Sequence, residues 1–156
     1  MDYLTLKWLH IVSATLLFGT GLGSAFYKYM TDRSGNLPAI AVTNRLVVRA
    51  DWLFTAPSIL LQPVTGVLLA HTLGHPLTSS WLVVSIALYI LAGCCWLPVV
   101  YLQILMRDQS EYALAAQQGL DARYAHLASL WFWLGVTAFT ALVIVYFLMI
   151  FKPALW

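Results

Sequence analysis

Three long stretches of this chain contain no charged residue. Asp, Glu, Lys and Arg are all absent from residues 8–27, 52–106 and 124–151. Since about 20 consecutive apolar residues form a helix that crosses a bilayer, the middle stretch can hold two helices and each outer stretch one. The pattern predicts an all-α integral membrane four-helix bundle that forms a single domain over residues 1–156. The predicted spans are residues 4–29, 51–72, 80–106 and 127–151.

The segments that join the spans carry helix start and stop signals. In the first link, Asn36 suits a helix cap and Pro38 suits the first turn of the next helix. The sequence RDQSEYALAAQQ after span three favours a helix, which Gly119 would stop before Asp121 caps span four. We therefore expect a helical hairpin that projects into the cytoplasm between spans three and four.

Two prolines, Pro57 and Pro63, interrupt the hydrogen-bond ladder of span two, so we expect kinks there. Gln62 and Thr65 are polar groups beside these prolines in mid-membrane. They either bind a substrate or satisfy the carbonyls that the prolines leave unpaired, and we favour the second interpretation.

Basic residues are unevenly distributed among the loops. Lys28, Arg33, Arg45 and Arg49 lie in or beside the first loop, residues 107 and 123 of the third loop are arginines, and the second loop has no basic residue. By the positive-inside rule, the first and third loops face the cytoplasm and both termini lie on the outer, periplasmic side.

The overall composition agrees with a membrane protein whose surroundings are a lipid bilayer. Hydrophobic residues make up 62% of the chain and charged residues 9%, and the mean hydropathy is +0.82. The net charge is only +2, and the chain has no basic cluster of the kind that binds nucleic acid. A secretory signal peptide is the alternative for the first span, but the apolar run is too long and has no clean cleavage signature.

His10 is an imidazole in a segment otherwise free of ionisable groups from residue 8 to residue 27. It shares one helical face with small residues such as Gly21 and Ser24, which should face the bundle interior. A polar group there is a functional candidate, and neutral imidazole is a common haem ligand. The alternative is an interfacial histidine bonded to a backbone carbonyl or a lipid headgroup.

His71 ends span two at nearly the predicted depth of His10, so the two imidazoles are candidate metal ligands that would clamp one iron. Lys7, one turn outward of His10, is a candidate partner for a haem propionate, or else a lysine that snorkels to the interface. We expect His75 to be a solvated turn residue, and His126 lies too far from the others to share a metal with them.

Several small residues and the carboxylate of Asp51 are expected to have structural roles, in helix packing and in an ion pair. Gly19 and Gly23 have the small-xxx-small spacing that lets another helix approach closely. Gly66 and the two prolines of span two are further candidates for helix packing. We expect Asp51 to pair with Lys28 or Arg49.

The segments LKWLH, TAPSILLQPVTG and FWLGVTAFTALVIVYFLMIFKP resemble an uncharacterised bacterial family of predicted integral membrane proteins, a domain of unknown function. More distantly, the chain is similar to HemJ-type protoporphyrinogen oxidases and CopD-like membrane domains. The HemJ likeness rests on Leu9 with His10, on Pro57 with Gly66, and on the final Lys-Pro. It implies a haem b site at His10 in a bacterial inner membrane. The Asn-Glu pair that HemJ proteins carry before their last span is missing.

Two classes of function follow. The first is an inner-membrane haem b protein, with His10, His71 and Lys7 at the cofactor, that either transfers electrons or acts as an oxidoreductase on a small lipophilic or porphyrin-like substrate. The second is a cofactor-free scaffold or accessory subunit that binds a partner membrane protein or a second copy of itself through the face of Gly19 and Gly23. Copper handling is a weaker alternative, because methionine and histidine are not clustered.

Overall fold

The computed structural model describes residues 2–156, and all regular structure in this range is helical. Side-chain caps mark the first residues of α2 and α5. Asn36 accepts a hydrogen bond from the backbone N–H of Ala39 (3.1 Å), and Asp121 accepts one from that of Tyr124 (3.0 Å), which confirms both predicted caps. The elements are α1 (Tyr3–Ser34), α2 (Leu37–Ala50), η1 (Asp51–Thr55), α3 (Ala56–Thr72), α4 (Ser80–Ala115) and α5 (Ala122–Phe151).

Four helices are long and apolar enough to cross a membrane, because α2, η1 and α3 form one continuous helix over Leu37–Thr72. Their outer surfaces carry large apolar side chains such as Leu60 and Ile150, which are 71% and 70% exposed. Lipid is the medium in which such surfaces are stable. The predicted all-α architecture with four candidate spans is therefore confirmed.

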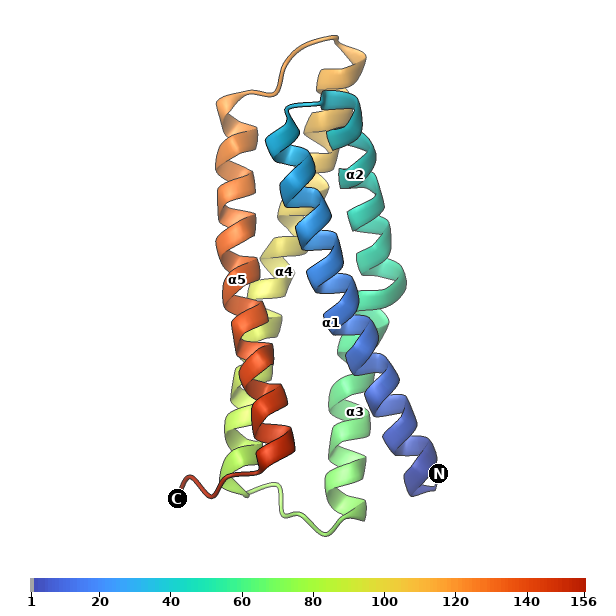
Figure 1. Cartoon of the computed structure of the whole chain (residues 1–156), viewed down its shortest axis with the longest axis vertical. Helices are drawn as coiled ribbons and strands as arrows, with labels where there is room; N and C mark the ends of the chain where they lie inside the picture. The colour runs from blue at the N-terminus through green and yellow to red at the C-terminus, as the bar shows by residue number, and fades with distance from the viewer. Residues whose placement is uncertain (1) are drawn as a thin grey trace.

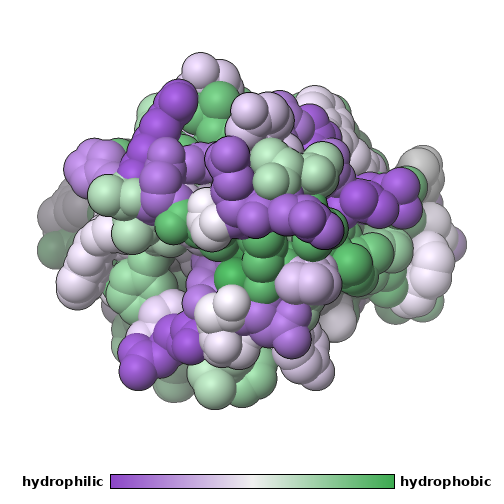
Figure 2. All heavy atoms as spheres, turned by 90° about the horizontal axis from the view of Figure 1, so that it is seen from above, coloured by the Kyte–Doolittle hydropathy of each residue, from purple (hydrophilic) through white to green (hydrophobic). Residues whose placement is uncertain are grey.

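The helices run antiparallel, so that both termini lie at one end of the molecule (Figure 1). We call this the terminal end, and it also holds the connection of residues 73–79. The opposite end, with the connections at residues 35–36 and 116–121, is the loop end. Hydrophilic residues cover much of the loop-end face, with hydrophobic side chains visible between them (Figure 2).

The prediction of a projecting hairpin is wrong in one respect: the end of α4 does not stand clear of the bundle, because α2 packs beside it. Asn44 Nδ2 donates to Ser110 Oγ (3.0 Å), and Arg45 pairs with Glu111 across 2.8 Å. The end of α4 is thus packed against α2 and does not project with α5 alone. The stop of α4 also differs from the expectation, since Gln117, not Gly119, takes the left-handed conformation after the helix (φ 52°).

The expected roles of Gln62 and Thr65 beside Pro63 are also wrong. Pro63 lacks an N–H, which frees the carbonyl of Ile59 one turn earlier. The hydroxyl of Tyr89 on α4 donates to that carbonyl across 2.8 Å. The side chains of Gln62 and Thr65 bond instead to α1 or to their own turn.

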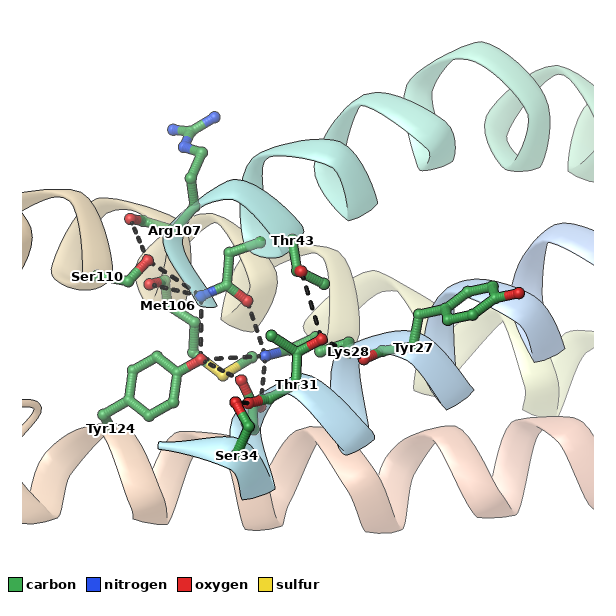
Figure 3. Close-up of polar contacts among 11 residues, drawn as sticks. Tyr27, Lys28, Thr31, Ser34, Thr43, Met106, Arg107, Ser110 and Tyr124 are labelled. Carbon is green, nitrogen blue, oxygen red and sulfur yellow. Dashed lines mark hydrogen bonds and ion pairs between the residues drawn. The ribbon is translucent and has the colours of Figure 1, made fainter. Parts of the chain in front are cut away.

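A buried cluster around Lys28 joins the helices at the loop end (Figure 3). Lys28 is 1% exposed, and its Nζ donates to Asp32 Oδ2 (2.8 Å), Asn44 Oδ1 (2.8 Å) and Tyr124 Oη (3.2 Å). The Tyr124 hydroxyl donates in turn to Asp32 Oδ1 across 2.8 Å. Three helices, α1, α2 and α5, therefore share one ion pair and its hydrogen bonds.

The expected ion pair between Asp51 and Lys28 or Arg49 is wrong. Lys28 is paired with Asp32, and none of the ion pairs in residues 2–156 includes Asp51. Beside the cluster lies the main apolar core, to which Ile40, Leu102, Met106 and Trp131 belong. Lys28 Nζ stands 5.1 Å from the centre of the Trp131 ring, a cation–π arrangement.

Candidate functional site: an apolar cavity with unpartnered polar atoms

A cavity of about 400 Å³ lies between α1, η1, α4 and α5, with Ile59 of α3 at its edge. Most of its lining is apolar or aromatic, including Phe18, Phe139 and Tyr89. Trp131 belongs both to this lining and to the core beside the Lys28 cluster. The cavity therefore adjoins the main apolar core of the bundle.

Four buried polar atoms without a hydrogen-bond partner belong to residues that line this cavity. They are Asp51 Oδ2, Gln103 Oε1, and the indole Nε1 of Trp96 and of Trp131. No other side-chain nitrogen or oxygen in residues 2–156 is both buried and unpartnered. Since nearly all buried polar groups in folded proteins have a partner, the gathering of four such atoms around one cavity marks it as a candidate binding site.

Asp51 owes its position to a π-helical turn. The backbone N–H of Ala56 bonds to the carbonyl of Asp51, five residues earlier, so the helix widens over Asp51–Thr55. The Thr55 hydroxyl donates to Asp51 Oδ1 across 2.8 Å and orients the carboxylate. The Gln103 amide is the other polar side chain beside Asp51, and Oδ2 has no hydrogen bond of normal geometry. Asp51 is only 4% exposed. Such single π-turns frequently occur at functional sites.

The cavity reaches the surface of the bundle between α1 and α5. Its lining includes Leu22 and Phe26 of α1 and Phe132 and Val136 of α5, which are all exposed on the outside. Figure 1 shows α1 crossing the bundle obliquely and separating from α5 toward the terminal end. These exposed lining residues place the outer side of the cavity on the membrane-facing surface between α1 and α5.

His10 lies on a separate polar contact between α1 and α3. Its Nδ1 is 2.8 Å from Thr65 Oγ1, and the Thr65 hydroxyl itself donates to the carbonyl of Leu61 across 2.7 Å. Because that hydroxyl has only one proton, we assign the His10 proton to Nδ1, which leaves Nε2 as the acceptor atom. Gln62 Nε2 strengthens the same contact by donating to the His10 carbonyl (2.8 Å) and to Ser13 Oγ.

The structure does not place His71 or Lys7, the other predicted cofactor ligands, beside the His10 ring. The imidazole instead packs against Gly66 of α3, where a Cβ atom would lie 3.4 Å from His10 Cε1. The neighbours of the ring on α3 are therefore Thr65 and Gly66. His71 lies six residues beyond Thr65 along the chain and is exposed. Lys7 is exposed, with its Nζ 5.7 Å from the centre of the Tyr3 ring. Their roles as cofactor ligands stay predictions.

The other two histidines lie elsewhere. His75 is half-buried rather than solvated, with its Nε2 3.3 Å from Lys152 Nζ and its ring edge against Trp81. His126 is exposed in the first turns of α5, toward the loop end. Among residues 2–156, no three His, Cys, Asp or Glu side chains gather where they would hold one metal ion.

Gly19 and Gly23 have no packing partner within the described chain. A Cβ built at either position meets no atom within 4 Å. Gly66 does have a close neighbour, the imidazole of His10. The packing role of Gly19 and Gly23 against another helix stays a prediction.

The sequence interpretation missed the cavity residues. It treated Asp51 as half of an ion pair and passed over Gln103, Trp96 and Trp131. One signal was present: Asp51 borders the longest charge-free stretch, and Gln103 lies inside that stretch. Polar side chains within a membrane span are functional candidates by default.

The fold and the site define a class, an integral membrane protein with four candidate spans and an internal cavity in its bundle. A family model described as "Predicted integral membrane protein (DUF2269)" matches residues 4–153. The chain belongs to this family. Neither a curated protein nor a solved structure matches it. The comparisons give no support to the similarity with HemJ-type oxidases or CopD-like domains.

Proposed function

We propose that the chain binds a lipophilic small molecule with a polar group, taken from the bilayer, in the cavity between α1, η1, α4 and α5. The observation that carries this proposal is the set of four unpartnered buried polar atoms around one otherwise apolar cavity. Small-molecule sites have this character: an apolar wall and a few polar groups that set orientation.

The unpartnered atoms also describe the ligand's polar group. Trp96 and Trp131 offer indole N–H donors, while Asp51, with the Gln103 amide beside it, offers a carboxylate acceptor. Leaving a buried donor or acceptor unpaired costs about 1–3 kcal/mol, so a ligand with complementary groups would recover part of that cost on binding. A pure hydrocarbon would not.

We place the protein in the bacterial inner membrane with the loop end toward the cytoplasm. The support is the charge distribution, because Arg33, Arg45, Arg107 and Arg123 lie at the loop end and the connection of residues 73–79 has no Lys or Arg. The outer side of the cavity between α1 and α5 then faces the hydrocarbon region.

A cavity-filling variant tests the proposal. Gly135 lines the cavity, and a Cβ built there meets no atom within 4 Å, so Gly135→Phe can be accommodated while its ring occupies the space. We expect the wild-type protein in nanodiscs to bind the neutral dye N-phenyl-1-naphthylamine saturably, above the level of empty nanodiscs. Gly135→Phe should weaken that binding at least about tenfold, the equivalent of 1.4 kcal/mol.

Ser129→Phe is the matched control for this experiment. It places the same ring on the same helix at an exposed position outside the cavity lining, so dye binding should stay at the wild-type level. Equal dye binding by both variants, or no saturable binding by the wild-type protein, would contradict the proposed function.

Haem b binding at His10 is a second candidate function. The observation that favours it is the Nδ1–H to Thr65 bond, because a ligating histidine usually donates its other ring N–H in this way and keeps Nε2 for the iron. This contact supplies one axial ligand at most, since His71 is exposed and lies six residues beyond Thr65 along the chain. A bound haem b would supply one-electron redox chemistry.

An absorption spectrum of the purified protein tests this second candidate. A haem protein shows a Soret band, and we expect His10→Ala to lose or shift it. His126→Ala, which replaces an exposed histidine toward the opposite end of the bundle, should leave the band unchanged. A preparation that stays colourless after haem is supplied would rule out haem b and leave the cavity proposal intact.

A further inference from the structure

Asp51 has a property that the other cavity residues do not share. It is the only Asp, Glu, Lys, Arg or His among the described residues that line the cavity. Asp51 is 4% exposed, with one carboxylate oxygen bonded to Thr55 and the other without a partner. An ionised carboxylate in such an apolar wall needs a counter-charge.

The chain does not provide that counter-charge among residues 2–156. The buried cation of the bundle, Lys28, already pairs with Asp32 at 2.8 Å. The two other ion pairs, Arg45 with Glu111 and Arg107 with Asp108, lie at the loop end. Of the buried acidic and basic side chains in the described residues, Asp51 is therefore the one without an ion-pair partner.

Aromatic rings surround the same space. Tyr89, Trp96 and Trp131 line the cavity together with Phe18 and Phe139. The face of an aromatic ring attracts a cation, and the attraction is strongest when the cation is shielded from water. Lys28 over the Trp131 ring, at 5.1 Å, is an example of this contact in the same bundle.

We propose that the ligand of this cavity is a lipophilic organic cation, such as an amphiphilic amine, whose positive charge is held by Asp51 and whose apolar body lies against the aromatic lining. This inference rests on the proposed function and narrows it to one chemical class. A neutral ligand would leave an ionised Asp51 without a counter-charge, whereas a cation brings the missing charge from outside. The outer side of the cavity between α1 and α5 admits a molecule that has partitioned into the bilayer.

Two probes of similar shape and opposite charge test the proposal. Tetraphenylphosphonium is a lipophilic cation, and tetraphenylborate is an anion of the same architecture. We expect isothermal titration calorimetry of the full chain in an uncharged detergent to detect saturable binding of tetraphenylphosphonium, with about one site per chain. Tetraphenylborate should bind at least tenfold more weakly than tetraphenylphosphonium, or not at all.

Two variants connect the binding to the carboxylate. Asp51→Asn keeps the size of the side chain and an oxygen that can accept from Thr55, so it should remove the charge alone and weaken tetraphenylphosphonium binding at least tenfold. Asp51→Glu retains the charge and should keep much of the binding. If Asp51→Asn does not fold, the comparison of the two probes on the wild-type protein still decides the question.

The outcomes separate this inference from the proposed function. Dye binding that Gly135→Phe removes, together with no preference for the cation, would overturn the inference and leave the proposed function standing. Cation binding that is unaffected by Asp51→Asn would also overturn it. Absence of both dye and cation binding would defeat both proposals.

Discussion

Lys28→Ala is expected to destabilise the protein by about 3–5 kcal/mol, the usual cost of removing one partner from a buried ion pair. Lys28 is 1% exposed and donates three hydrogen bonds, to residues of α1, α2 and α5. Its removal leaves Asp32 with an uncompensated charge and Asn44 Oδ1 without its donor. The measurement is the free energy of unfolding in mixed micelles, compared with the wild-type protein.

Two further variants make this prediction specific. Lys7→Ala removes an exposed lysine from the same helix and should change the free energy of unfolding by no more than about 0.5 kcal/mol. The double variant Lys28→Met with Asp32→Asn removes both charges and should be less destabilised than the single Lys28→Ala variant. If Lys28→Ala were as stable as Lys7→Ala, the cluster would not be what holds the loop end together.

Trp131→Ala is expected to cost a similar amount, about 3–5 kcal/mol, the range for large-to-small substitution of an aromatic residue in a core. Trp131 is 5% exposed and belongs to the core that includes Leu102 and Met106. Its removal would join the space it fills to the existing cavity of about 400 Å³. Neighbouring side chains cannot collapse to fill so large a volume. The free energy of unfolding in mixed micelles again provides the measurement.

Trp133→Ala is the matched control, two residues further along the same helix. Trp133 is 64% exposed, on a face that lipid rather than protein covers, so its loss creates no internal space. We expect its effect on the free energy of unfolding to stay within about 0.5 kcal/mol. Equal losses for the two variants would mean that the core around Trp131 is less tightly packed than the structure indicates.

The number and character of the helices could be predicted because they depend on local properties of the chain. Charge-free stretches of sufficient length, the caps at Asn36 and Asp121, and the helix-favouring sequence after span three each act within a few residues. The helix α1 proved longer than its predicted span, since it continues to Ser34, whereas α4 continues to Ala115 as the sequence after span three indicated. Polar residues beyond the apolar stretch continue a helix when a neighbouring helix packs beside them.

The candidate site could be predicted only in part. His10 was recognised as an inward-facing polar residue, and the structure does place it in a polar contact with Thr65. The pairing of Asp51 was predicted wrongly, because Lys28 lies on another helix and its partner depends on how the helices are rotated. A rotation of one residue, about 100°, is enough to move a side chain from one neighbour to another.

By itself, the sequence determined that this protein is an all-α membrane protein with four candidate spans, because hydrophobicity and length act locally and a bilayer admits few alternatives. Only the tertiary structure decided which polar groups meet: Lys28 with Asp32 and Tyr124, Tyr89 with the carbonyl of Ile59, and His10 with Thr65. It also left one carboxylate oxygen of Asp51 without a partner at the wall of a cavity. These contacts depend on the tilt and rotation of helices relative to one another, and side-chain packing over the whole bundle sets those angles.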